Sequence, residues 1–338
     1  MSTDAATLES LAALAGVPGG RAPEVLADRP DGTVVRCGPV AVKVHDGRSD
    51  LVRLAQRLRI AAHPLLRGVL LAPLPLPMAA AVPAQPSPGP AFGAGQPPRA
   101  GAGLLGALPD GRAVSRWPYG VPVAPDAPEE APWVPAGRLL ARLHAVPVHR
   151  LPGPVPVSRG PAKAAGAVLR MRRSAAASRY REPVERVWAG LPGWARGAPE
   201  AARPGPDATL SHGDLHLGQL VRLPATQDGW RLIDVDDLGR GVPAWDLARP
   251  AAWFAAGLLD PDDWSAFTGA YRAAGGAALP PGDDPWAVLD VPARALTAQT
   301  AATGLLRALA EDRPPDEVEQ ALLDACLRIA RIAPAGPP

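Results

Sequence analysis

The segment at residues 210–221, LSHGDLHLGQLV, carries an unusual concentration of side chains that could do chemistry. His212, Asp214, His216 and Gln219 lie there between apolar flanks. Imidazole, carboxylate and amide groups at this spacing are typical of a transition-metal site or of a phosphoryl-transfer site. A third interpretation is structural, because Asp and His side chains also bond the local backbone in turns.

A predicted β-hairpin brings further carboxylates to the same segment. The runs QLVRL and WRLID are strand-like, and PATQDG between them is typical of a turn. A symmetric turn places Gln219 opposite Asp234, and opposed residues have Cβ atoms about 4.5–5.5 Å apart. With Asp214 nearby, these oxygens would suit Mg²⁺, which takes one or two carboxylates and completes its shell with water and phosphate. A register shift of one residue would turn Asp234 to the other face.

A hydrolytic metal centre made of His212, Asp214 and His216 is an alternative, because these residues alternate like ligands on a strand. Gly213 instead suits a loop, and the other histidines form no second ligand pair in the sequence. Phosphoryl transfer needs a positioned base, a Mg²⁺ site and a cation on the nucleotide phosphates. Only that interpretation also uses Lys43, one of two lysines among 35 basic residues, which lies inside an apolar strand.

The elements before this segment predict a small β-rich region. Short β-rich runs separated by turns predict antiparallel strands, the last of them at residues 39–45. Leucine spacing predicts helices within residues 1–16 and 48–63. Residues 68–77 and 111–120 predict two further strands.

The rest of the chain predicts a helical region. The Pro/Gly-rich segment 79–103 predicts a mobile loop, after which helical patterns dominate around the hairpin. The final helix begins at a capping box, DEVE, at residues 316–319. We therefore expect an N-terminal lobe at residues 1–117 and a helical C-terminal lobe at residues 118–338.

Composition argues against several classes of protein. The chain has 338 residues, of which 47% are hydrophobic and 20% are charged, as in a globular protein with a sizeable core. A net charge of +2 gives no footprint for nucleic acid or an acidic membrane. Cys37 and Cys326 lie too far apart in sequence to suggest a disulfide framework or a cysteine metal site. We found neither a leader nor an apolar run of membrane-span length, so we expect a cytoplasmic protein without nucleic-acid or membrane partners.

The motifs HGDLHLGQ, LIDVDD and WDLA resemble the catalytic core of the aminoglycoside phosphotransferase family. The pattern of that family is His-Gly-Asp-x-His-x-x-Asn, then Ile-Asp, then Asp-x-Ala, and the Leu-Gly-Gln variant is similar to that of bacterial maltokinases. The resemblance is specific over residues 211–248 and is supported by AVKVH and GRLLARLHAVP. It implies an α+β, two-lobed protein-kinase-like fold, with a small antiparallel-sheet N-terminal lobe and a larger, mainly helical C-terminal lobe that holds a catalytic β-hairpin.

The resemblance also implies a role for each matching residue. The implied roles are Asp214 as catalytic base, Gln219 and Asp234 as Mg²⁺ ligands, His212 and Asp246 as structural supports of the site, Lys43, Ser115 and Trp117 as nucleotide contacts, and His216, Asp236 and Asp237 as acceptor contacts. The implied reaction transfers phosphate from ATP or GTP to a hydroxyl of a small molecule, such as an aminoglycoside, a sugar or another natural product.

Two departures from the family pattern keep a catalytically degenerate nucleotide-binding protein as an alternative. The helix after Lys43 contains no glutamate, so Asp46, Asp50 or the phosphates alone would hold that lysine. No glycine-rich phosphate loop is visible.

A cationic acceptor would need an acidic cleft, which Asp236, Asp237 and the runs LLDPDD and PPGDD would supply.

Overall fold

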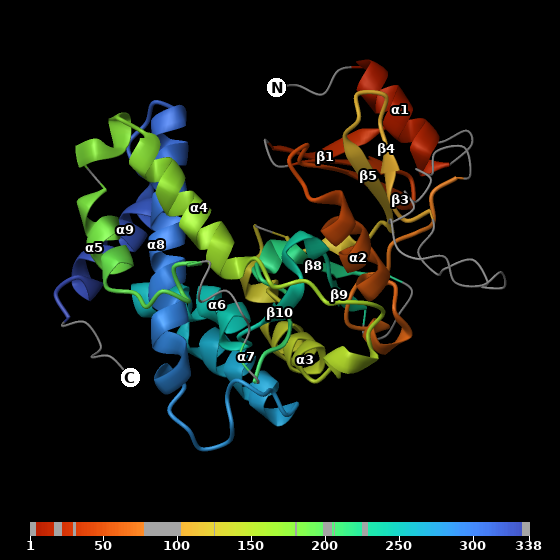
Figure 1. Ribbon diagram of the computed structural model, residues 1–338. Helices are drawn as coiled ribbons and strands as arrows, with labels where there is room; N and C mark the ends of the chain where they lie inside the picture. The colour runs from red at the N-terminus through yellow and green to blue at the C-terminus, as the bar shows by residue number, and fades with distance from the viewer. Residues whose placement is uncertain are drawn as a thin grey trace, which may run out of the picture. The chain divides into compact units, whose positions relative to one another are not determined.

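The computed structural model forms two compact units (Figure 1). It describes residues 5–16, 22–29, 32–77, 103–124, 126–179, 181–198, 205, 207–224 and 229–332. The first unit comprises Met1–Pro122, Arg150–Pro156 and Val221–Asp236, and the second comprises Val123–His149, Val157–Leu220 and Asp237–Pro338. The first segment ends close to the expected boundary, but most of the hairpin clusters with the N-terminal unit and not with the helices. The predicted loop at 79–103 lies outside the described residues except for Gly103.

A five-stranded antiparallel sheet organises the described part of the first unit, in the order β1-β2-β3-β5-β4. Its strands are β1 (Glu24–Arg29), β2 (Gly32–Cys37), β3 (Val40–His45), β4 (Gly106–Ala107) and β5 (Ala113–Pro118). Helix α1 (Ala5–Ala15) covers one face of this sheet (Figure 1). The predicted first helix and the predicted strand that contains Lys43 are thereby confirmed.

The two faces of the sheet differ in chemistry because alternate side chains of a strand point to opposite sides. Val42 and Val44 of β3 are buried in an apolar cluster with Leu11 of α1. Lys43 and His45 lie on the opposite face, and Ser115 of β5 is paired directly with Lys43. The local alternation of β3 therefore turns its only lysine away from the apolar core.

The strand expected at residues 68–77 is wrong. Helix α2 (Leu51–Ala61) is followed by a short 3-10 turn, η1 (Pro64–Leu66), and then by isolated pairings of Leu70 with Leu232 and of Leu74 with Arg116. The alternating prolines of this segment, Pro73, Pro75 and Pro77, have no N–H group to donate to a ladder.

The hairpin forms, but with a different register from the one expected. Its strands, β8 (Leu220–Arg222) and β9 (Trp230–Leu232), make a three-stranded sheet with β6 (Val121–Pro122). The Leu223 N–H donates to the Gly229 carbonyl over 2.8 Å, which is one residue out of step with a symmetric turn. The expectation that Gln219 and Asp234 are paired strand residues is therefore wrong. Gln219 ends the 3-10 turn η7 (Leu217–Gln219), and Asp234 follows β9 with a φ of 62°.

The described part of the second unit is mainly helical. Its helices are α3 (Trp133–His144), α4 (Gly160–Arg173), α5 (Glu182–Ala189), α6 (Ala244–Ala256), α7 (Pro261–Ala273), α8 (Trp286–Ala310) and α9 (Glu317–Ile329). It also has the 3-10 turns η3 (Pro128–Glu130) and η5 (Ala176–Arg179) and the paired strands β7 (Thr209–Ser211) and β10 (Gly239–Gly241). The 3-10 turns η4 (Val148–Arg150) and η8 (Val235–Asp237) contain residues of both units. The long helix α8 packs against α4, α5, α6 and α9, and α3 packs against α7 (Figure 1).

Local sequence signals set the ends of several of these helices. The predicted capping box of α9 is confirmed, because Asp316 and Glu319 each accept a hydrogen bond from the backbone N–H of the other. The basic segment before the hairpin forms the two consecutive helices α4 and α5. No helix in the described ranges is both long enough and apolar enough to span a lipid bilayer.

Candidate active site

The first group of functional side chains surrounds Lys43 in the N-terminal unit. The Lys43 Nζ lies 2.7 Å from Asp234 Oδ1 and 3.0 Å from Asp236 Oδ2. Neither aspartate considered from the sequence alone holds this lysine. Asp50 caps α2 by accepting from backbone N–H groups, and Asp46 is bonded to Arg48. The acidic partner of Lys43 therefore comes from the segment after β9 and not from the helix after β3.

His45 completes this group, and its role was not evident from the sequence. Its Nδ1 lies 3.1 Å from Asp236 Oδ2, and its Nε2 lies 2.8 Å from Ser115 Oγ. The only sequence signal was its position two residues after Lys43 on the same strand face. Ser115 Oγ also accepts from Trp117 Nε1 over 2.8 Å, and all these partners except Asp236 are buried. The side chains of Ser115 and Trp117 are therefore occupied by internal contacts.

Ion pairing keeps Lys43 and Asp236 ionised despite their burial. Burial alone would lower the pKa of Lys43, but the charges of Asp236 and Asp234 and their hydrogen bonds raise it well above its ordinary value. Burial would raise the pKa of Asp236, but Lys43 and then His45 lower it strongly. One ammonium against two carboxylates leaves an excess of one negative charge, and 35% of the Asp234 side chain is exposed.

The second group surrounds Asp214 in the helical unit. Asp214 Oδ2 lies 2.6 Å from Lys163 Nζ, and Asp214 Oδ1 accepts from Arg249 over 2.7 Å. Lys163 also lies 3.0 Å from Asp237 Oδ2, and Arg159 lies 3.5 Å from the other oxygen of Asp237. The predicted catalytic carboxylate is thus held between two cations. Lys163 is the second lysine of the chain, and its rarity was the only signal that could have identified it.

These contacts set the protonation of Asp214 and Lys163. Burial would raise the pKa of Asp214, but Lys163 and Arg249 together lower it below its ordinary value. Burial would lower the pKa of Lys163, but Asp237 and Asp214 raise it. Asp214 is therefore an ionised, weakly basic carboxylate whose two oxygens have fixed directions.

Asp246, at the start of α6, holds the backbone that carries Asp214. Its Oδ2 accepts from the His212 N–H over 2.6 Å, and its Oδ1 accepts from the Gly213 N–H over 2.7 Å. His144 Nε2 lies 3.0 Å from Asp246 Oδ2, and His144 Nδ1 lies 2.8 Å from the Tyr271 hydroxyl. All these groups are buried. This is the bracing geometry expected for Asp246, whereas the contributions of His144 and Tyr271 were not foreseen.

Gly213 is required by its conformation and by its surroundings. Its φ is 88°, in the left-handed region that L residues with a side chain rarely adopt. A Cβ atom built there would lie 2.6 Å from the Asp237 carbonyl oxygen and 2.7 Å from Ser158 Oγ. The glycine of the HGD motif is therefore set by the tight path of the loop.

The remaining predicted residues lie on the same loop. His216 Nδ1 accepts from the Gly218 N–H over 3.1 Å, and burial followed by the Arg249 charge lowers the pKa of His216 to about 4. Gln219 is buried at the end of η7. Within the described residues, no three His, Cys, Asp or Glu side chains are grouped so that they could hold a metal ion. His212, Asp214 and His216 therefore form no such group.

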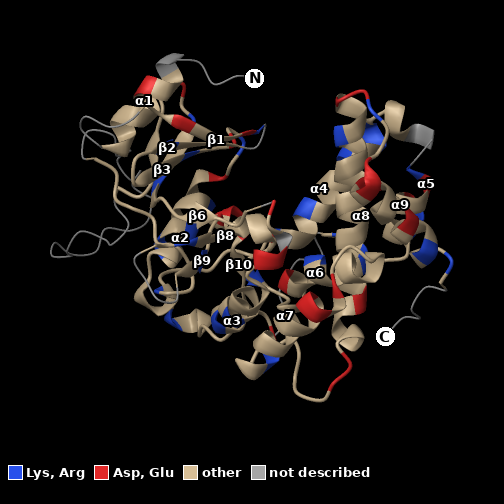
Figure 2. Ribbon diagram, turned by 180° about the vertical axis from the view of Figure 1, so that it is seen from behind, with Lys and Arg blue, Asp and Glu red and all other residues tan. Residues whose placement is uncertain are grey.

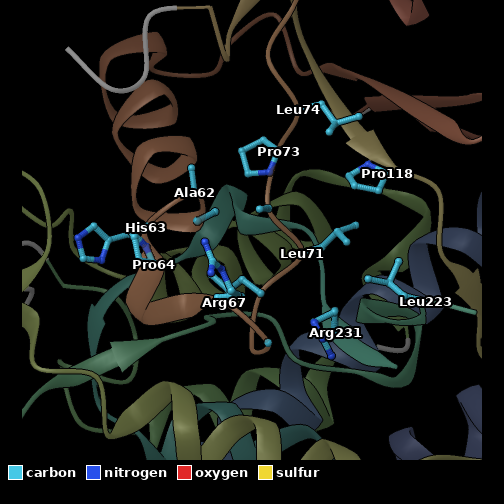
Figure 3. A pocket seen from close by; sticks show the side chains of 14 residues that line it. Ala62, His63, Pro64, Arg67, Leu71, Pro73, Leu74, Pro118, Leu223 and Arg231 are labelled. Atoms are coloured by element: carbon cyan, nitrogen blue, oxygen red, sulfur yellow. The ribbon is translucent and has the colours of Figure 1, made fainter. Parts of the chain in front are cut away.

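A hollow of about 350 Å³ in the first unit lies apart from these residues (Figure 3). Half of its lining residues are prolines and leucines such as Pro73 and Leu71, and the side chains of Arg67 and Arg231 lie at its wall. Neither Lys43 nor Asp234 contributes to the lining. The hollow is therefore not part of the candidate active site.

Comparison with known proteins identifies the family. The sequence profile of the phosphotransferase enzyme family matches residues 104–289, more than half of the chain. The chain belongs to this family. The matched region includes Asp214, Asp234 and Asp246, whereas Lys43 lies before it. The predicted resemblance is thus confirmed, and the chain is a small-molecule phosphotransferase.

Solved structures show the same fold over nearly the whole chain. An aminoglycoside phosphotransferase in complex with AMP-PNP and hygromycin B has a TM-score of 0.55 at 12% identity, covering 99% of this chain and 100% of that one. Spectinomycin phosphotransferase in complex with ADP and spectinomycin has a TM-score of 0.53 at 12% identity, covering 96% and 98%. A choline/ethanolamine kinase family protein from Mesorhizobium loti has a TM-score of 0.52 at 16% identity, covering 96% and 95%. The kinase-like α+β fold is therefore confirmed. No curated protein matched the sequence.

Proposed function

We propose that the protein transfers the γ-phosphoryl group of ATP or GTP to a hydroxyl of a small molecule, with Mg²⁺ as cofactor. The observation that carries this proposal is the ion pair between Lys43 and Asp234, residues that lie 191 positions apart in the sequence. It joins a partly buried strand lysine to the carboxylate expected to bind the metal. A cation for the phosphates beside a carboxylate for Mg²⁺ is the pairing that phosphoryl transfer requires.

Asp234 fits a role in holding Mg²⁺. Its carboxylate is partly exposed, and the group of Lys43, Asp234 and Asp236 has an excess of negative charge and oxygen donors, which Mg²⁺ prefers. When bound, the metal would offset negative charge on the nucleotide phosphates. Lys43, held in place by the two aspartates, would contact those phosphates.

Asp214 would orient the acceptor. The acceptor oxygen attacks the γ-phosphorus, the bond from that phosphorus to the bridging oxygen of the nucleotide breaks, and the proton of the hydroxyl passes to Asp214. The lowered pKa of Asp214 makes it a weak base. A weak base suits a loose transition state, in which the hydroxyl proton leaves late and positioning contributes most of the acceleration.

If the protein is instead a catalytically degenerate nucleotide-binding protein, replacement of Asp214 should cause no loss of turnover. The test compares wild type with Asp234→Asn, Asp214→Asn and a surface control, Asp110→Asn. Nucleotide binding would be followed by thermal shift with and without Mg²⁺, and turnover by slow hydrolysis of ATP and GTP in the absence of an acceptor.

We expect Asp234→Asn to weaken Mg²⁺-dependent binding at least tenfold, whereas Asp214→Asn keeps binding but loses at least 99% of turnover. The control should behave as wild type. Binding without any loss of turnover in Asp214→Asn would favour the degenerate alternative. No binding of either nucleotide by the wild type would refute the proposal.

A further inference from the structure

The carboxylates near Asp214 already have cationic partners. Asp237 is bonded to Lys163 and paired with Arg159, and Asp214 is bonded to Lys163 and Arg249. Two carboxylates therefore face three cations in this unit. In the other unit, Asp236 is occupied by Lys43 and His45. An ammonium group of an acceptor would have to displace one of these cations before it gained a carboxylate.

Asp260 of the run LLDPDD and Asp284 of the run PPGDD bond backbone N–H groups at the starts of helices. Asp260 Oδ1 accepts from the Asp262 N–H over 2.8 Å at the start of α7. Asp284 Oδ1 accepts from the Trp286 N–H over 3.0 Å at the start of α8. Carboxylates at these positions satisfy unpaired N–H groups and favour the positive end of the helix. Asp260 and Asp284 therefore already bond the first turns of α7 and α8.

A row of basic side chains runs along helix α4, and its first members are the residues that pair with Asp237 and Asp214. Arg159, Lys163, Arg170 and Arg173 recur at helical spacing on one side of α4, and we call this row the basic ridge. The helix itself contains no Asp or Glu. Figure 2 shows its blue basic residues. A helix rises about 1.5 Å per residue, so Arg170 lies roughly 10 Å beyond Lys163 along the axis.

The outer arginines of the basic ridge are not used by the fold. Arg170 and Arg173 are exposed, and in the ranges that the structure describes no carboxylate lies within salt-bridge distance of either. Their neighbour Arg172 differs, because it makes a close ion pair with Glu185. Gly166 lies between Lys163 and Arg170 on the same side, where an added Cβ would meet only the Arg170 guanidinium at 3.4 Å. The outer part of the basic ridge thus combines the unpaired positive charge of Arg170 and Arg173 with an open position at Gly166.

We propose that the acceptor is a hydroxyl compound that carries a negatively charged group, a carboxylate or a phosphate. Its hydroxyl lies at Asp214, and its anionic group lies against Arg170 and Arg173 of the basic ridge. The proposal rests on the proposed phosphotransferase function and specifies the substrate class of that site. Arg170 and Arg173 lie roughly 10 Å and roughly 15 Å beyond Lys163 along the axis of α4, so the hydroxyl and the anionic group lie at different ends of the acceptor.

Matched acceptor mixtures test this assignment. The anionic mixture contains gluconate, glucose 6-phosphate and lactobionate, the neutral mixture contains glucose and lactose, and the cationic mixture contains glucosamine and kanamycin A. Each is incubated with the full-length protein, Mg²⁺ and γ-labelled ATP or GTP, and labelled products are separated from free phosphate. We expect labelled product from the anionic mixture at a rate at least tenfold above the other two.

Charge reversal then tests the basic ridge. The double variant Arg170→Glu/Arg173→Glu should raise KM for the labelled anionic acceptor at least tenfold, with a smaller effect on kcat. Arg138→Glu, an exposed arginine on α3, changes the net charge in the same direction and should leave KM within twofold of wild type. The separation of carboxylate from phosphate acceptors in the first screen identifies the anion.

Three results would overturn the proposal. They are faster labelling of the neutral or cationic mixture, no labelling of the anionic mixture by a protein that hydrolyses Mg²⁺–nucleotide, and an equal KM in the double variant and the Arg138→Glu control. Failure of the wild type to bind or hydrolyse any nucleotide would instead refute the phosphotransferase function itself. The two failures are therefore distinguishable.

Discussion

Replacing Asp246 by asparagine tests how the Asp214 loop is held. The carboxylate accepts three hydrogen bonds on two oxygens, from the His212 and Gly213 N–H groups and from His144. An asparagine of the same shape has one acceptor oxygen and one NH₂ group. In either orientation of the amide, one of the two backbone N–H groups faces another donor.

The cost of the substitution can be worked from these contacts. A buried N–H group that loses its acceptor costs about 1–3 kcal/mol, and the remaining bonds weaken because they no longer involve a charged acceptor. We therefore expect Asp246→Asn to lower the free energy of unfolding by about 2–4 kcal/mol. Asp246→Ala leaves all three donors without this acceptor, so its loss of unfolding free energy should be larger. Such a loss is a large part of the roughly 5–15 kcal/mol by which a typical domain is stable.

Urea unfolding measures this difference as a shift of the midpoint at an unchanged m-value. Asp290→Asn is the matched control, because Asp290 makes a partly exposed pair with Arg294. It should cost less than about 1 kcal/mol. A loss below about 1 kcal/mol in Asp246→Asn, or equal losses in Asp246→Asn and Asp246→Ala, would refute the reasoning. Turnover of folded Asp246→Asn should also fall, because the loop that orients Asp214 loses a fixed point.

Further predictions concern charge and backbone conformation. Lys163→Gln removes a cation that lowers the pKa of Asp214, so the acidic limb of the kcat–pH profile should move to higher pH, and an unmoved limb would contradict the assigned coupling. Gly213→Ala should reduce the free energy of unfolding by more than about 1 kcal/mol in a thermal or urea melt, because an alanine is strained at a φ of 88° and its Cβ would lie 2.6 Å from a backbone oxygen. Glu319→Gln should destabilise the protein at pH 7. The Arg313 hydrogen bond lowers the pKa of Glu319 to about 2, so the stability difference between variant and wild type should persist above its ordinary pKa of 4.5 and vanish as pH falls towards 2.

Local sequence signals were sufficient for much of the fold. The leucine spacing of α2 and the Asp316–Glu319 capping box of α9 depend on residues a few positions apart, and both elements form as predicted. The strand of Lys43 follows from alternation within six residues. Residues 68–77 make only isolated pairings, because prolines recur at positions 73, 75 and 77. A missing N–H prevents regular pairing even where the side-chain pattern suits a strand.

The sequence by itself determined the family, through the motifs HGDLHLGQ, LIDVDD and WDLA, and it predicted the hairpin between the first two motifs but not its register. Only the tertiary structure decided which charges meet. Lys163 reaches Asp214 from 51 residues away, and Lys43 reaches Asp234 from 191 residues away. The physical reason is the range of the forces involved. Periodicity and capping act within one or two turns of the chain, whereas an ion pair forms only where packing brings its two partners within about 4 Å.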